Sequence, residues 1–403
     1  MKKLIVHIGN FFILITICYS TSAQLPRVFM MDANRLTTVK EKIQKKDAST
    51  LQLVTALRKE ADGLLTMKPV SVTDKAFTPV SGDKHDYMSQ APYFWYDSTK
   101  PNGLPYMRKD GVRNPEINKI TDHRLCNELD NACRTLALAW YCTGEEKYAA
   151  KATSLLRYWF LDDATKMNPN LNYAQAIPGI NNGRGIGIIE TIALTGIVDA
   201  TGLLQSSKSF TEADAKAIQQ WYAQYLNWML TSKNGNEEHA AKNNHGTWFY
   251  AQAIDFALYT GNTAKAKELV EETKKRMDSQ INKEGKMQLE LDRTNGLGYS
   301  TFNLTAWFKV ATLAQYTGVN LWQYVNQQGG SLRTAIDWLL PYALGQQKWS
   351  YQQISEYKKN NIYTLLLQAA AVYKDPRYAA SAKQLDEEVD NITMDLLYKV
   401  ADH

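Results

Sequence analysis

Two short stretches of the chain carry side chains suited to chemistry on an anionic ligand. The first, KNNHGTWFY at 242–250, places Asn243, Asn244 and His245 where a helical pattern begins. Either asparagine can cap that helix, so a cap alone accounts for one of them. Free N–H groups and the positive end of the helix dipole favour a carboxylate at such a point. We therefore interpret the second asparagine and the histidine as candidate ligands of a carboxylate.

The second stretch, LDRTNGLGYSTF at 291–302, places Arg293 and Tyr299 on an approach to another helix. Arginine matches a carboxylate well because its planar fork donates two hydrogen bonds. A tyrosine can accept and donate a proton if a neighbouring cation lowers its pKa. Taken singly, the arginine could be a surface ion-pair partner and the tyrosine a packed aromatic residue.

Two long connections add polar and aromatic side chains. The segment 81–116 interleaves aromatic residues with cations, and the segment 168–185 is rich in amides. Aromatic faces and cations together suit an anionic sugar chain, whereas a belt that packs across the fold is the open alternative for 81–116. The candidate substrate-binding residues are Lys84, His85, Tyr93, Trp95, Arg108, Asn172, Gln175 and Arg184.

The elements that must position these residues form a helical repeat. Apolar residues three and four apart dominate, and the predicted helix ends at 144, 202, 261, 318 and 375 recur every 57 to 59 residues. Such a period holds a helical hairpin that buries its face only against its neighbours. We expect an all-α fold of six or seven hairpins, either a solenoid or a closed α/α toroid. The long connections favour the toroid, with the loops at 168–185, 233–245 and 287–300 at one mouth.

The N-terminal segment and the net charge limit the classes of protein that fit this sequence. Residues 1–23 are typical of a secretory signal, with Lys2 and Lys3 before an apolar run that is too short to span a membrane. We expect an exported protein, periplasmic or secreted, with 24–403 as one catalytic domain. Lipid attachment at Cys18 is a less favoured alternative, because Ile17 stands directly before Cys18 where a small residue is expected. Removing the signal lowers the net charge from +5 to +3, which is too small to indicate nucleic acid.

No other constellation competes for the site. The chain has no phosphate-loop, zinc-protease or serine-hydrolase motif. Cys126, Cys133 and Cys142 lack metal-site spacing and are expected to be buried small residues. A glycosidase would need two acids across a cleft, but Glu290 and Asp292 alternate with leucines, which favours the solvent face of a short strand.

In combination these stretches resemble the alginate lyase domain proteins, namely polysaccharide lyase family 5 and the related family 38 enzymes that act on alginate or glucuronan. The resemblance rests on 81–111, on MNPNLNYAQAIPG, on NNH followed by Trp248, and on the loop from Arg293 to Tyr299. It covers 80–320 most clearly. It implies an α/α toroid, β-elimination, Trp248 among the substrate-binding residues, and catalytic positions at Asn244, His245, Arg293 and Tyr299.

The chemistry expected of a polyuronate lyase fits these side chains. Asn244, His245 and Arg293 would neutralise the substrate carboxylate and stabilise developing charge. Tyr299, with its pKa lowered by Arg293 and His245, would take the C5 proton and return a proton to O4 of mannuronate. For the C5 epimer, His245 would be the base and Tyr299 the acid. No metal or other cofactor is required by this scheme.

Three alternatives stay open at this point. The substrate could be β-1,4-glucuronan rather than mannuronate-rich alginate. The protein could bind anionic glycans without cleaving them, or it could be a hydrolase built on the same toroid.

Overall fold

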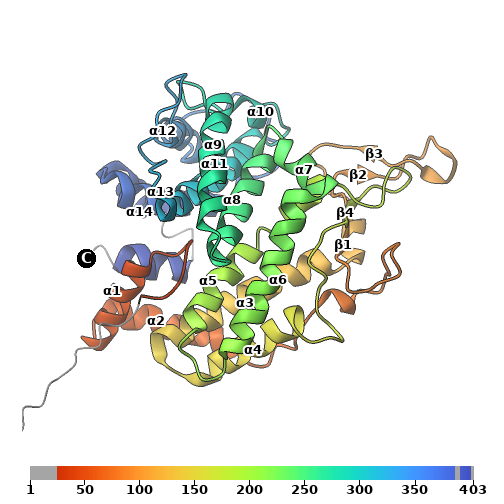
Figure 1. The fold of residues 1–403 in the computed structure, drawn as a ribbon. Coiled ribbons are helices and arrows are strands. Elements are labelled where there is room, and N and C mark those ends of the chain that lie inside the picture. The colour runs from red at the N-terminus through yellow and green to blue at the C-terminus, as the bar shows by residue number, and fades with distance from the viewer. Residues whose placement is uncertain (1–24, 386–390, 401–403) are drawn as a thin grey trace, which may run out of the picture.

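The computed structural model describes residues 25–385 and 391–400, so the predicted signal at 1–23 lies outside the described part. Helices dominate it (Figure 1). The α-helices are α1 (Ala33–Gln44), α2 (Ala48–Leu64), α3 (Asp122–Thr143), α4 (Glu146–Phe160), α5 (Leu194–Leu204), α6 (Glu212–Thr231), α7 (Lys233–Ala240), α8 (Asn244–Tyr259), α9 (Thr263–Gln280), α10 (Gln288–Leu291), α11 (Gly296–Ala314), α12 (Leu332–Ala343), α13 (Asn360–Tyr373), α14 (Pro376–Leu385) and α15 (Ile392–Met394). Short helical turns are η1 (Val72–Asp74), η2 (Pro101–Gly103), η3 (Pro115–Lys119), η4 (Gly185–Thr191), η5 (Gln315–Thr317) and η7 (Asp395–Val400).

The helices form the predicted α/α toroid. Inner helices α3, α5, α8, α11 and α13 contact one another in that order. Outer helices α4, α9, α12 and α14 each pack against the inner helix that precedes them, and α6 packs against α8. The last turn, η7, contacts α1, α2 and α13, which joins the two ends of the described chain. The ring follows from the sequence repeat, because each hairpin buries its apolar face only against its neighbours.

The few strands of the described residues lie together on one side of the helical body (Figure 1). Strand β1 (Met88–Gln90) pairs in parallel with β4 (Tyr173–Ala176). Strand β2 (Phe94–Trp95) pairs antiparallel with β3 (Met107–Arg108). These pairs organise the two long connections, so the segment 81–116 contains a hairpin rather than only an irregular belt.

The helix ends agree with the repeat at most positions. Gly144 and Gly318 cap their helices in the left-handed conformation, with φ of 71° and 77°. Gly261 also has positive φ just after α8. Helix α13 ends at Tyr373, two residues before the predicted position, and Lys374 is its left-handed cap.

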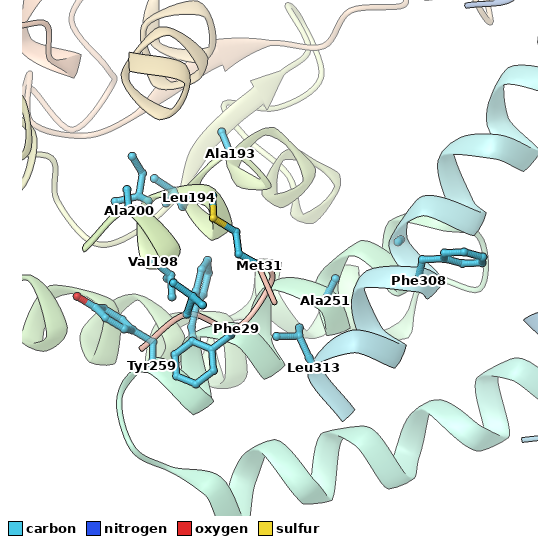
Figure 2. Close-up of a cluster of buried hydrophobic side chains, with 14 of the residues drawn as sticks. Phe29, Met31, Ala193, Leu194, Val198, Ala200, Ala251, Tyr259, Phe308 and Leu313 are labelled. Carbon is cyan, nitrogen blue, oxygen red and sulfur yellow. The ribbon is translucent and has the colours of Figure 1, made fainter. Parts of the chain in front are cut away.

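The predicted helix end at Gly202 is wrong, because Gly202 lies inside α5. A Cβ atom there would overlap the carbonyl oxygen of Arg27, so the glycine permits close approach of the N-terminal segment. That segment crosses α5 and packs Phe29 and Met31 among the buried side chains of Figure 2. The buried carboxylate of Asp199 accepts hydrogen bonds from the backbone N–H groups of Phe29 and Met31, each at 2.6 Å.

One further helical stretch is notable for its hydropathy. Residues Gly185–Leu204 are long and apolar enough by composition to cross a membrane, but 78% of that window is buried inside the protein. This is the behaviour of a core helix. The cysteines Cys126, Cys133 and Cys142 are buried and free on α3, as expected.

Candidate active site

A cleft of about 590 Å³ lies where the strands meet the starts of α8 and α11. All four predicted catalytic residues line it, together with four of the predicted substrate-binding residues. These eight are Tyr93, Arg108, Gln175, Arg184, Asn244, His245, Arg293 and Tyr299. The structure thus brings to one mouth residues that are up to 206 positions apart. Their roles in catalysis and binding remain predictions.

The start of α8 contains a helix cap and a buried carboxylate. Asn243 is the cap, and its side-chain oxygen accepts from the backbone N–H of His245. The expected anion at this helix end is the protein's own Glu290, whose carboxylate accepts from Asn244 N and Asn244 Nδ2, both at 2.6 Å. Burial raises the pKa of Glu290 to about 7, although the bonds from Asn244 oppose the shift. Asn244 is therefore engaged with Glu290 in the free protein.

The expectation that Glu290 lies on the solvent face of a strand is wrong. Glu290 is on the short helix α10 and is 1% exposed, whereas Asp292 just beyond it is exposed. Two leucine neighbours suggested a strand because a single helical turn is too short to show its period in the sequence.

His245 is oriented by a second buried acid. Its Nδ1 lies 2.8 Å from Oε1 of Glu238, which is 1% exposed at the end of α7. The other oxygen of this carboxylate, Oε2, is buried without a hydrogen-bond partner in the described part of the chain. A carboxylate that accepts from Nδ1–H leaves Nε2 as the nitrogen available to a ligand, as in other histidine–carboxylate pairs.

Arg293 and Tyr299 form a directly bonded pair at the other wall. Nη2 of Arg293 donates to the phenol oxygen of Tyr299 at 2.8 Å, and its Cζ lies 3.8 Å from the tyrosine ring centroid. The phenol oxygen of Tyr93 is also 2.8 Å from that of Tyr299. Tyr299 lies in the first turn of α11, which begins at Gly296. This helix start is stabilised by Gln353, whose Oε1 accepts from the N–H groups of Leu297 and Gly298.

The prediction of a lowered pKa for Tyr299 is wrong for the free protein. Burial raises the pKa of Tyr299 well above its ordinary value, and the neighbouring Tyr93 raises it further. Arg293 acts to lower the pKa but does not outweigh these effects, and Asp110 adds to them. Tyr299 is consequently a neutral phenol at neutral pH.

Arg184 is a cleft guanidinium without a carboxylate partner among the described residues. Its Nη2 donates to Oε1 of Gln175 at 2.7 Å, and its Nε is buried without a partner. Burial and the neighbouring charge of Arg108 lower the pKa of Arg184. Gln175 is held with φ of 49°, a left-handed conformation that is strained for glutamine. Glu190 and Glu238 act on Arg184 only from beyond ion-pair distance, so its guanidinium is available to an anion in the cleft.

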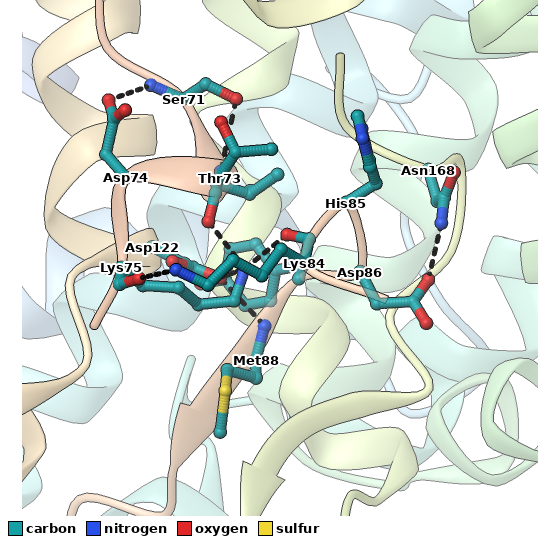
Figure 3. A network of polar contacts seen from close by, with 12 residues as sticks. Ser71, Thr73, Asp74, Lys75, Lys84, His85, Asp86, Met88, Asp122 and Asn168 are labelled. Carbon is teal, nitrogen blue, oxygen red and sulfur yellow. Dashed lines mark hydrogen bonds and ion pairs between the residues drawn. The ribbon is translucent and has the colours of Figure 1, made fainter. Parts of the chain in front are cut away.

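Two predicted substrate-binding residues lie in a separate polar network (Figure 3). Nζ of Lys84 donates to the carbonyl oxygen of Lys75, and Nδ1 of His85 lies 2.6 Å from the carbonyl oxygen of Lys166. Lys75 itself pairs with Asp122 at 3.1 Å, with both side chains fully buried. The network therefore ties the segment 81–116 to the helical body, and Lys84 and His85 do not line the cleft.

Three other predicted ligands are also placed outside the cleft. Trp95 donates from Nε1 to the carbonyl oxygen of Val112, which stabilises the β2–β3 hairpin. Oδ1 of Asn172 accepts from Nε1 of Trp228 on α6 at 3.1 Å. Trp248 is 2% exposed and packs against Phe302, because α8 is buried on nearly all sides.

Sequence reasoning missed three acids that organise the site, namely Glu238, Glu290 and Asp110. Asp110 follows β3 and forms an ion pair with Arg293 at 2.8 Å. An isolated acid in a sequence gives no sign that it will be buried. The spacing of Glu290 and Arg293, three residues apart across the end of α10, is the one local hint. No cluster of three or more His, Cys, Asp or Glu side chains arranged to hold a metal ion occurs in 25–385 and 391–400.

Comparisons with known proteins agree on the family and fold. A sequence model of the family described as alginate lyase matches residues 71–349. A search of curated proteins finds no match. The crystal structure of an alginate lyase from Bacteroides ovatus is 40% identical, with a TM-score of 0.87, covering 93% of this chain and 99% of that one.

More distant solved structures share the fold. A histidine-to-alanine variant of alginate lyase A1-III, complexed with a tetrasaccharide, is 16% identical with a TM-score of 0.54, covering 81% of this chain and 88% of its own. Alginate lyase A1-III from Sphingomonas species A1 is 16% identical with a TM-score of 0.51, covering 79% and 86% respectively.

Proposed function

The chain belongs to the alginate lyase family, and on that premise we propose that it is a polysaccharide lyase that cleaves 1,4-linked polyuronates by β-elimination, with mannuronate-rich alginate as its preferred substrate. The observation that carries the proposal is the cleft in which the bonded pair Arg293–Tyr299 faces the same space as His245 and the unpaired Arg184. The export signal proposed from 1–23 would place this activity in the periplasm or outside the cell.

The first requirement of β-elimination is neutralisation of the uronate carboxylate, since an ionised carboxylate makes the C5 proton very weakly acidic. Arg184 supplies an unpaired positive charge for this purpose. Asn243 adds an amide whose Nδ2 makes no hydrogen bond within the described ranges, while Asn244 is held by Glu290. We therefore assign the contact with the carboxylate to Arg184, Asn243 and His245, and we assign Asn244 to shaping the helix end.

The second requirement is a base at C5 and an acid at O4. In mannuronate both positions lie on one face, so Tyr299 can serve both. Its phenolate oxygen takes the C5 proton, the C5–H electron pair becomes the C4=C5 double bond, and the C4–O4 bond breaks. The new phenol then gives its proton to O4. Arg293, 2.8 Å from the phenol oxygen, stabilises the phenolate.

The raised pKa of Tyr299 predicts an alkaline pH dependence. Below the pKa of a phenol, the phenolate fraction grows about tenfold for each pH unit. Because the pKa of Tyr299 is raised, this growth continues to higher pH. We expect kcat/KM on polymannuronate to keep rising above neutral pH. The measurement is the initial rate across pH at constant ionic strength, since salt screens a polyanionic substrate. A rate that levels off near neutral pH would indicate that a group other than Tyr299 removes the proton.

A substrate panel tests the proposed specificity. Polymannuronate, polyguluronate, glucuronan and hyaluronan are incubated with the protein, and ultraviolet absorbance and product size are followed. We expect the fastest gain of absorbance with polymannuronate. If glucuronan is cleaved fastest, glucuronan rather than mannuronate-rich alginate is the preferred substrate. New reducing ends without absorbance would indicate a hydrolase. Binding without any cleavage would indicate a glycan-binding protein.

A further inference from the structure

Asp110 reaches the arginine of the active site from the β2–β3 hairpin. It follows strand β3, and its carboxylate accepts from both Nε and Nη2 of Arg293, at 3.1 and 2.8 Å. The two side chains are 22% and 15% exposed, so water screens the pair only in part. This bidentate arrangement fixes the plane of the guanidinium as well as its position.

The same guanidinium nitrogen serves the tyrosine. Nη2 of Arg293 has two hydrogens, and it contacts Oδ1 of Asp110 and the phenol oxygen of Tyr299, each at 2.8 Å. The orientation that satisfies Asp110 is therefore the one that directs the second hydrogen at the phenol. Without Asp110, the arginine side chain regains rotamers in which that contact is lost.

The local sequence is adapted to this approach. Gly111 has φ of 73°, and a Cβ there would overlap Oγ1 of Thr294. That hydroxyl donates to Oδ2 of Asp110 at 3.1 Å, and Arg108 donates to Oδ1 at 2.7 Å. The carboxylate thus has partners both on the hairpin, at Arg108, and before the start of α11, at Arg293 and Thr294.

The β2–β3 hairpin carries a second contact to the same phenol. Phe94 pairs with Arg108 across the hairpin, and Lys109 N donates to the carbonyl oxygen of Tyr93 at 2.8 Å. This pairing sets Tyr93 and Asp110 at the two exits of the hairpin. One hairpin therefore bonds Tyr299 directly, through Tyr93, and indirectly, through Asp110 and Arg293.

The charges around this arrangement are few. Tyr93, Arg293 and Asp110 face Tyr299, and Glu290 acts on Arg293 from α10. Arg293 and Arg108 face Asp110 and, despite its burial, hold its pKa well below the usual range. Asp110 is thus ionised at neutral pH and is shared between Arg293 and Arg108, so it offsets only part of the charge of Arg293. The ion pair holds Arg293 in the orientation that bonds Tyr299.

We propose that Asp110 is a positioning residue, which holds the guanidinium of Arg293 against the phenol of Tyr299. The inference rests on the proposed function of Tyr299 in β-elimination. It assigns Asp110 an effect on the chemical step rather than on substrate affinity.

Asp110→Asn tests the inference, with Asp97→Asn as the matched control on an exposed loop of the same hairpin. We expect kcat to fall about 10–100-fold in Asp110→Asn, as for other residues that orient a catalytic group, while KM changes little. Arg293 lowers the pKa of Tyr299 more than Asp110 raises it, so when Arg293 leaves the phenol the rise of rate with pH should move to higher pH. Asp97→Asn should match the wild type in all three respects.

Two kinetic outcomes would overturn the inference. One is an unchanged kcat in Asp110→Asn. The other is a higher KM with an unmoved pH profile, which would indicate that Asp110 only helps to fold the hairpin. Thermal unfolding of both variants verifies that the comparison is made on folded protein.

Crystal structures of the wild type and Asp110→Ala provide a test that needs no activity. The guanidinium of Arg293 should leave the phenol of Tyr299 in the variant, and retention of this contact would overturn the inference. If the wild type cleaves no polyuronate, the proposed function fails, and this structural comparison still decides whether Asp110 positions Arg293.

Discussion

Tyr299→Phe is expected to abolish the formation of unsaturated product while leaving the fold intact. The substitution removes only the oxygen that accepts from Arg293 and contacts Tyr93. General acid–base groups contribute about 10²–10⁴-fold each, and Tyr299 serves as both base and acid in the proposed route. We therefore expect the rate on polymannuronate to fall by about 10³-fold or more.

The matched control for this variant is Tyr96→Phe. Tyr96 lies on the same hairpin as Tyr93, is 54% exposed and does not line the cleft. The initial rate of ultraviolet absorbance gain is compared among wild type and both variants, and circular dichroism monitors folding. Near-full activity of Tyr299→Phe would remove Tyr299 from the mechanism, and His245 would become the remaining candidate for the base.

Arg293→Lys is expected to lower kcat by about 10²-fold even though the positive charge is kept, because a small misplacement of a catalytic group can cost that much. Nε and Nη2 of Arg293 hold Asp110, and Nη2 also donates to Tyr299. A lysine ammonium is a single point donor on a flexible stem and cannot reproduce this planar fork.

Arg333→Lys is the corresponding control, since Arg333 forms a surface ion pair with Asp375 at 2.8 Å, away from the cleft. Both variants are assayed for kcat and KM on polymannuronate. Wild-type kcat in Arg293→Lys would show that charge alone is required at this position, and the geometric role assigned to Arg293 would then be incorrect.

The toroid was predictable because its repeat is marked by the residue types that end each helix. Gly144, Gly261 and Gly318 adopt the positive φ that the end of a helix requires, and glycine adopts it without a Cβ clash. Gly202 shares the spacing but serves the close approach of Arg27, which comes from a distant part of the chain. A local pattern cannot distinguish a glycine that ends a helix from one that admits another segment.

The site was predictable to the extent that the repeat places helix starts at one mouth. It grouped His245 with Arg293 and Tyr299, which the structure brings to one cleft. Burial was not visible in the sequence, so the pKa of Tyr299 was assigned the wrong direction, and Glu238 was not singled out. Trp248 was expected at the substrate, but α8 is enclosed by other helices and buries it.

Cleavage of a polyuronate by elimination in this cleft would leave a chemical signature in the products. The most direct measurement is mass spectrometry of oligosaccharides released from polymannuronate by the wild-type protein, with ultraviolet absorbance recorded on the same sample. We expect products whose new non-reducing ends carry a C4=C5 double bond and which therefore weigh one water less than hydrolysis products, with absorbance rising in step. Products that contain the added water, or no products from any polyuronate, would contradict cleavage by elimination.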